Sequence, residues 1–305
     1  MKIKNLWSSI SPFNNRQEIP TALFVGKKIL GFLLIYAVAA LVGEAVIIGV
    51  LMVMGYDSLN GVMPAGHLAE LLKFYGFVGF LLVALLYCRI VEKRSIKSMG
   101  FNSKVYDLFT GCLAAVLLLT VIVGLCCAIG ALEFAGVASG VNGSYLIALL
   151  GAFFIQSMAE EAMSRGFLFQ SLSERVSMPV AMIVSAAAFS LGHLPSVLEA
   201  DGWFAVIGVV NLFLVSAVFA LLYHLRANIY IVGGLHCLWN FLLYGVMGLS
   251  VSGSTGNENA LLQFRVPAQS VFNGGVYGLE AGMITTVVLG IAVALLAAIS
   301  YKKER

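Results

Sequence analysis

The sequence predicts an all-α, polytopic membrane protein, a helical bundle with about eight transmembrane helices and both termini in the cytoplasm. Three observations predict this fold, and the first is composition. Of the 305 residues, 60% are hydrophobic and 11% are charged, and the mean hydropathy is +0.97. Soluble domains have roughly 45–50% apolar and about 25% charged residues, so this apolar excess does not fit into one globular core. The composition excludes a secreted disulfide scaffold, a disordered chain and a cytosolic nucleic-acid binder.

The second observation is the set of long apolar runs. About 20 residues of α-helix cross a hydrocarbon core of about 30 Å. The first run, 29–54, is too long for the core of a signal peptide and lacks a cleavage site of small residues, so we expect a retained span. The other predicted spans are 71–88, 108–132, 145–172, 176–198, 203–223, 227–249 and 281–301.

The third observation is the placement of Lys and Arg. Alternate connectors between the runs are almost free of both, and Arg265 is the one exception in 55–70, 133–144, 199–202 and 250–280. The positive-inside rule places the other connectors and both termini in the cytoplasm. We therefore expect three parts: a cytoplasmic or interfacial segment 1–28, a single membrane domain 29–301 and a cytoplasmic tail 302–305. The outer segment 250–280 is rich in Gly, Ser and Asn, and a re-entrant or capping role is open to it.

Charged residues interrupt the predicted fourth span. Glu160, Glu161 and Arg165 lie within six residues of one another. A charge at the bilayer centre costs at least about 2.5–3.5 kcal/mol, so these side chains must face a protein interior or a water-filled cavity. Glu161 precedes Arg165 by four residues, the favourable order for a helical ion pair. Glu160 is rotated about 100° from Glu161 and shares a face with Gln156 and Ser164. The spacing predicts one carboxylate held by Arg165 and one free for chemistry.

Two further predicted spans carry polar groups at a similar depth: His193 in the fifth, and His236 with Asn240 on one face of the seventh. At 1.5 Å per residue, Glu160, His193 and His236 lie roughly 14–26 Å from the cytoplasmic ends of their predicted spans. A carboxylate and an imidazole can activate water, and an imidazole with an amide can stabilise an oxyanion, so the set suits peptide-bond hydrolysis without a covalent nucleophile.

The same acid and two imidazoles can alternatively hold a zinc ion with one open position. Asn240 is a poor zinc ligand, and the sequence contains neither HExxH nor a paired cysteine set. Spacing alone leaves this alternative open, with Glu160, His193 and His236 as the candidate ligands. Two other functions also remain open: a proton-coupled transporter that relays ions through the same residues, and a non-catalytic immunity or scaffold protein. The polar groups can also be structural links between helices.

Three motifs carry a resemblance to a known family. They are EExxxR at Glu160–Arg165, FxxxH at Phe189–His193 and HxxxN at His236–Asn240, all within the region 145–249. In this order they resemble the motifs of the CPBP family, intramembrane proteases that process CAAX proteins and bacteriocins and are related to the Rce1 endopeptidase. Softer similarities lie at 94–101 and 274–280.

The resemblance implies a role for each motif residue. Glu160 and His193 would activate water, His236 and Asn240 would form the oxyanion hole, and Glu161 with Arg165 would orient the site. Members of the family have been described as glutamate-type and as metal-dependent proteases, so the resemblance implies either no required cofactor or a zinc ion.

The resemblance also implies partners and a location. The partners would be the lipid bilayer and a peptide or protein substrate. That substrate is a prenylated C-terminal peptide in eukaryotic members, and a bacteriocin leader or another membrane peptide in bacterial ones. Because the sequence shows no organelle or retention signal, we expect a multi-pass protein of a bacterial plasma membrane.

Overall fold

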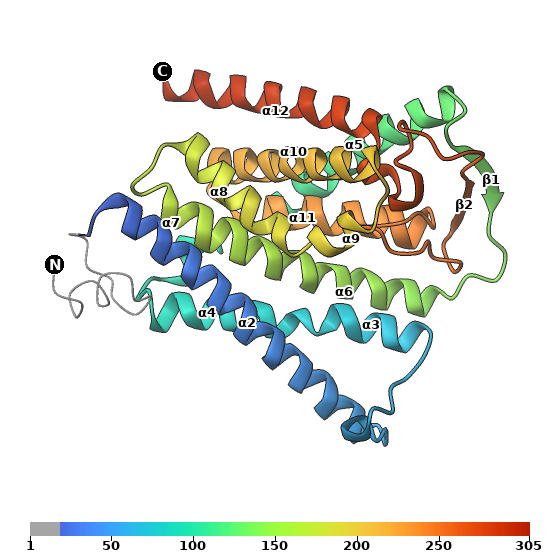
Figure 1. Ribbon diagram of the computed structural model, residues 1–305, viewed down its shortest axis with the longest axis horizontal. Helices are drawn as coiled ribbons and strands as arrows, with labels where there is room; N and C mark the ends of the chain where they lie inside the picture. Colours follow the sequence, from blue (N-terminus) through green and yellow to red (C-terminus); the bar gives the residue numbers. More distant parts are fainter. Residues whose placement is uncertain (1–18) are drawn as a thin grey trace.

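The computed structural model describes residues 19–305 as a bundle of long helices that run back and forth along one direction (Figure 1). Most of the segment 1–28 lies outside the described residues, and the description begins just before the first long helix. The structure is 71% helical and has almost no sheet, which confirms the predicted all-α helical bundle. The α-helices are α2 (Thr21–Val53), α3 (His67–Tyr75), α4 (Phe77–Ile90), α5 (Asp107–Ala128), α6 (Gly143–Glu161), α7 (Gln170–Leu172), α8 (Met178–Leu191), α9 (Leu194–Leu198), α10 (Trp203–Arg226), α11 (Ile229–Asn240) and α12 (Met283–Glu304).

Two π-helical segments extend these helices. The first, Ala162–Phe169, joins α6 to α7, and the second, Phe241–Val246, continues α11. Short 3-10 turns cover Ser58–Asn60, Ile96–Met99, Gly275–Tyr277 and Leu279–Ala281.

Seven of the described segments are long and apolar enough to cross a membrane, and they match seven of the predicted spans. The predicted span 176–198 differs, because α8 has only 14 residues and rises about 21 Å. The helix breaks at Gly192–His193, and α9 begins at Leu194 with Pro195 in its first turn, where the proline has no N–H to continue the hydrogen bonds of α8. The expectation of about eight full-length spans is therefore corrected to seven spans and one short helix.

The short helix still makes its pass through the bundle. Together α8 and α9 carry the chain from one end to the other, so the start of α2 and the end of α12 lie at the same end (Figure 1). The opposite end carries the antiparallel pair β1 (Glu133–Val137) and β2 (Leu262–Arg265). The segment 250–280 folds onto that end, where the Asn273 amide donates hydrogen bonds to the carbonyls of Ala131 and Ala268.

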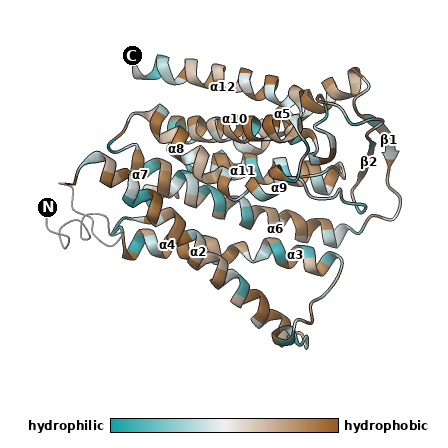
Figure 2. Ribbon diagram, viewed as in Figure 1, coloured by the Kyte–Doolittle hydropathy of each residue, from teal (hydrophilic) through white to brown (hydrophobic). Residues whose placement is uncertain are grey.

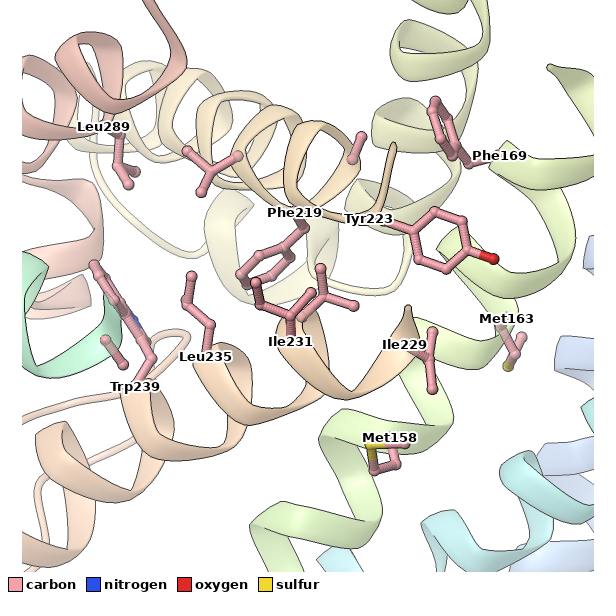
Figure 3. Close-up of a cluster of buried hydrophobic side chains, with 14 of the residues drawn as sticks. Met158, Met163, Phe169, Phe219, Tyr223, Ile229, Ile231, Leu235, Trp239 and Leu289 are labelled. Carbon is pink, nitrogen blue, oxygen red and sulfur yellow. The ribbon is translucent and has the colours of Figure 1, made fainter. Parts of the chain in front are cut away.

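The outer helices expose apolar side chains, and the inner helices are buried. Figure 2 shows the predominantly apolar character of α2, where Leu41 is 74% exposed. Such exposure is favourable when the surrounding solvent is lipid. Two-thirds of the span Ile229–Val246 is buried, the largest share of any candidate span, so α11 forms the centre of the bundle. Figure 3 shows Phe219, Leu235 and Leu289 filling the space beside α11.

Glycine allows α5 to contact the central helix closely. A Cβ added at Gly111 would lie 1.9 Å from the carbonyl oxygen of Ile231, and one at Gly234 would lie 2.3 Å from the carbonyl oxygen of Leu108. Membrane helices associate through such close backbone contacts, because burial against lipid supplies little driving force between helices.

We expect Gly111→Ala to destabilise the protein by about 1–3 kcal/mol, because the new methyl group would overlap backbone that belongs to another helix. Gly124→Ala is the matched control, since Gly124 lies on the same helix with nothing within 4 Å of an added Cβ. The control should be neutral or slightly stabilising, as alanine is the better helix former. Thermal unfolding in detergent measures both variants, and equal midpoints would contradict the close contact.

Candidate active site

The charged residues at the junction of α6 and the π-helical segment 162–169 form a buried ion pair. Arg165 Nη1 donates to Glu161 Oε1 at 2.9 Å, and both side chains are 0% exposed. Arg165 Nη2 also donates to Ser216 Oγ of α10 at 2.6 Å. The guanidinium lies between two aromatic rings, 4.7 Å from the Phe189 centroid and 4.9 Å from the Phe219 centroid. The pair that the spacing predicts is therefore present, and hydrogen bonds and cation–π contacts compensate for the loss of water.

His236 joins this network from α11. Its Nδ1 lies 3.0 Å from Glu161 Oε1, and because an ionised carboxylate only accepts hydrogen bonds, we assign the proton to Nδ1. This orientation leaves Nε2 directed at Glu160, 3.8 Å from Oε2. The imidazole also stacks on Phe219, with ring centroids 5.3 Å apart. His236 thus bridges the two neighbouring carboxylates.

Glu160 points away from the ion pair, as its helical phase predicts. Gln156 Nε2 donates to Glu160 Oε1 at 3.0 Å, and Asn240 Nδ2 donates to Gln156 Oε1 at 3.3 Å. A chain of two amides therefore links α11 to one oxygen of Glu160. The other oxygen, Oε2, has no hydrogen-bond partner in the described part of the chain. One carboxylate is held by Arg165 and the other is not.

His193 lies at the break after α8. Its Nδ1 is 3.1 Å from the carbonyl oxygen of Phe189, and its ring centroid is 4.6 Å from that of Phe189. The carbonyl accepts a hydrogen bond from Nδ1–H, so Nε2 of the neutral imidazole keeps its lone pair. Among the described residues, no hydrogen bond joins His193 to Glu160 or His236, so the predicted acid–histidine pair does not touch directly.

A cavity of about 380 Å³ brings the candidate residues to a common space. Its polar wall contains Gln156, Glu160, Ser164, His193 and Asn240. The volume lies within the usual range for small-ligand sites. The rest of the wall is dominated by aromatic side chains from several helices: Phe32, Tyr36, Phe74, Phe77, Phe80, Phe153, Phe189 and Tyr244.

The remaining motif residues lie behind this wall. Glu161, Arg165 and His236 do not belong to the cavity lining, and each has a buried partner described above. The structure therefore separates the predicted site into two layers. Glu160, His193 and Asn240 face the cavity, whereas the ion pair and His236 support Glu160 from the protein interior.

The segment 250–280 closes part of the cavity, with residues 251–254 in its wall. Glu280 holds this loop: Oε1 accepts a hydrogen bond from Trp239 Nε1 at 2.9 Å, and Oε2 accepts one from the backbone N–H of Ser252. Trp239 lies inside the HxxxN motif, so the loop and the motif are joined by one carboxylate. Residues 251–254 of this segment thus form part of the cavity wall.

Sequence reasoning did not identify Ser216 or Glu280 as part of the site. Ser216 is one serine in a long apolar helix, and spacing on α10 gives no reason to select it. Glu280 belongs to the segment 274–280, which is similar to the family, but it lies 41 residues after Trp239 in the sequence. Spacing therefore does not indicate that the two residues meet. Both contacts depend on the packing of separate helices, which local periodicity does not report.

The candidate zinc ligands do not form a preformed metal site. Within the described range 19–305, no group of three or more His, Cys, Asp or Glu side chains is placed to hold a metal ion. Glu160 and His236 approach each other at 3.8 Å, but among the described residues His193 forms no hydrogen bond with either of them. All five cysteines are free and distributed over several helices. No step of the mechanism below therefore passes through a metal ion.

Fold and site together define a multi-pass, all-helical membrane protein with an acid, a histidine and an amide around an apolar cavity. Residues 142–242 match the family model described as type II CAAX prenyl endopeptidase Rce1-like. The chain therefore carries an Rce1-like domain of the CPBP family, which confirms the resemblance of the three motifs. The matched range covers α6 to α11 and includes every motif residue. No curated protein matches the chain.

We expect the buried pair to contribute strongly to stability. Glu161→Gln or Arg165→Met alone should each cost about 3–5 kcal/mol, because each leaves a buried charge without its partner. The double variant should cost less than the sum, since no unpaired charge remains. Glu174→Gln is the control: Glu174 pairs with Arg94 at 3.3 Å but is half exposed, so we expect less than about 1 kcal/mol. Unfolding in detergent measures the four variants, and additive losses would contradict the coupling.

Proposed function

We propose that the protein is an intramembrane endopeptidase that hydrolyses a peptide bond with water activated by Glu160. The observation that carries the proposal is the division of the two carboxylates. Glu160 lines the cavity beside His193 and Asn240, whereas Glu161 is buried with Arg165. The Rce1-like domain belongs to a protease family, which supports hydrolysis as the reaction.

The proposed reaction uses residues of this chain alone. Glu160 removes a proton from water as the water oxygen attacks the substrate carbonyl carbon. His193, with its Nε2 lone pair, helps to orient that water from the other side of the cavity. The negative oxygen of the tetrahedral intermediate accepts a hydrogen bond from the second N–H of the Asn240 amide, whose first N–H is bound by Gln156. Glu160 then returns the proton to the leaving nitrogen as the C–N bond breaks.

We give His236 a different role from the one that the resemblance implies. It lies behind the cavity wall and faces Glu160 with Nε2 at 3.8 Å. This position supports a role in holding Glu160 in place with an imidazolium, whose Nδ1–H donates to Glu161 and whose Nε2–H faces Glu160. The Glu161–Arg165 pair fixes the ring in turn. In the proposed mechanism the oxyanion contact therefore falls mainly to Asn240.

The proposed substrate is a membrane-associated peptide. An aromatic cavity favours apolar side chains or an attached lipid, which is consistent with a prenylated peptide or a hydrophobic leader. We further propose a bacterial plasma membrane with both termini in the cytoplasm. The supporting observation is that the connectors rich in Lys and Arg lie at the end of the bundle where α2 begins and α12 ends (Figure 1).

We expect Glu160→Gln to lower the cleavage rate by about 10²- to 10⁴-fold, because glutamine does not accept a proton. His193→Ala should give a smaller loss, and Glu174→Gln, remote from the cavity, should leave the rate unchanged. Proteoliposomes with each variant and a library of prenylated and unprenylated membrane peptides provide the assay, read by mass spectrometry. Equal cleavage by wild type and Glu160→Gln would overturn the proposal. Proton-coupled flux abolished by the same variant would favour a transporter, and neither activity in wild type would favour a scaffold.

We also expect cleavage to continue after exhaustive treatment with a chelator, because the proposed steps use only side chains. The measurement is the initial rate before and after dialysis, together with metal content by mass spectrometry. A rate that falls with the loss of bound zinc and returns on its addition would show a metal-dependent enzyme.

A further inference from the structure

One positive side chain lines the cavity. Of the described residues in the wall, Lys73 of α3 is the one Lys or Arg, and its Nζ lies 5.7 Å from the centroid of the adjacent Phe74 ring. No ion pair of the described residues includes Lys73. Lysine is expensive within a membrane span unless its ammonium group reaches water or an anion. Lys73 is exposed, so its ammonium group is accessible to water and to an anionic group of a bound ligand.

The nearest acid along α3 is engaged elsewhere. Glu70 precedes Lys73 by three residues, a spacing that normally permits a helical ion pair. The Glu70 carboxylate instead accepts a hydrogen bond from the Tyr145 hydroxyl of α6. Lys73 thus remains available at the side of the cavity.

Packing places the residue next to Lys73 against α6, at a level that can be related to Glu160. The neighbouring Phe74 packs on Phe153 of α6, with ring centroids 4.7 Å apart. Phe153 precedes Glu160 by seven residues, which is about 10 Å along the helix axis. An extended peptide rises about 3.3–3.6 Å per residue. About three residues therefore span the rise along α6 from the level of Phe153, where α3 packs, to the level of Glu160.

The two charges have opposite signs, and their separation orients a bound anion. Glu160 repels a carboxylate and Lys73 attracts it, so an anionic group binds at the α3 side of the cavity and not beside the reacting bond. We propose that Lys73 forms a subsite for a carboxylate of the peptide substrate and thereby sets the direction in which the peptide lies across Glu160. This inference rests on the proposed endopeptidase function. It assigns a specificity residue outside the three motifs and outside the matched range 142–242.

Binding to the Glu160→Gln variant in detergent tests the subsite without cleavage. The probes are a dansyl-labelled peptide of five apolar residues with a free C-terminal carboxylate, and the same peptide as its C-terminal amide. We expect the acid to bind about ten- to a hundredfold more tightly, as for a hydrogen bond to a charged group. Adding Lys73→Met should reduce the preference to within about twofold, whereas Lys73→Arg should retain it.

A second probe pair separates the two sources of a carboxylate. Here both peptides end in an amide, and the last residue is either Glu or Gln. A preference for Glu alone assigns the subsite to an acidic side chain, and a preference for the free terminus alone assigns it to the peptide end. Either result supports the subsite when Lys73→Met removes it.

The matched control is Lys97→Met, because Lys97 lies in the connector after α4 and not in the cavity wall. It should leave the preference unchanged. Equal affinity for all four peptides, or a preference that survives Lys73→Met, overturns the inference. A protein that shows the binding preference but never cleaves a peptide retains the subsite and loses the endopeptidase function, so the two failures are distinguishable.

Discussion

The burial of one ion pair in the membrane is the constraint on which the rest of the site depends. Glu161 and Arg165 are stable in the bundle only where other polar groups satisfy them. Arg165 therefore requires Ser216 of α10, and Glu161 requires His236 of α11. These contacts fix the rotation of α6 about its own axis. Since Glu160 is about 100° from Glu161, the same rotation directs Glu160 into the cavity.

Much of the fold follows from patterns that the sequence displays directly. Apolar runs identify the spans, and the alternation of basic connectors is consistent with the pairing of helix ends. The short helix α8 escapes this reasoning, because the run 176–198 stays apolar across the break at His193. Hydropathy reports whether lipid accepts a segment, not whether the backbone stays helical. Pro195 is the local signal for the break, because it has no backbone N–H to donate to the helix while its side chain is compatible with an apolar run.

The site shows where sequence reasoning ends. Residues on one helix are related by a fixed angle, so the Glu161–Arg165 pair and the separate direction of Glu160 can be predicted from spacing. Contacts between helices depend on side-chain packing that spacing does not encode. The direction of His236 toward Glu160, the distance of His193 from both, and the link from Glu280 to Trp239 all belong to this second kind. Each of these contacts depends on how separate helices pack against one another.

The two π-helical segments each begin directly after motif residues, one after Glu161 and one after Asn240. Each residue of a π-helix advances the chain by a smaller angle than the 100° of an α-helix, because its hydrogen bonds join residues five apart. A single span is thereby divided into two angular registers. The α-helical part directs Glu160 into the cavity, and the π-helical part adds Ser164 to the cavity wall while it buries Phe167 in the packed interior. The change of helix type thus lets one continuous span contribute side chains to both the cavity wall and the packed interior.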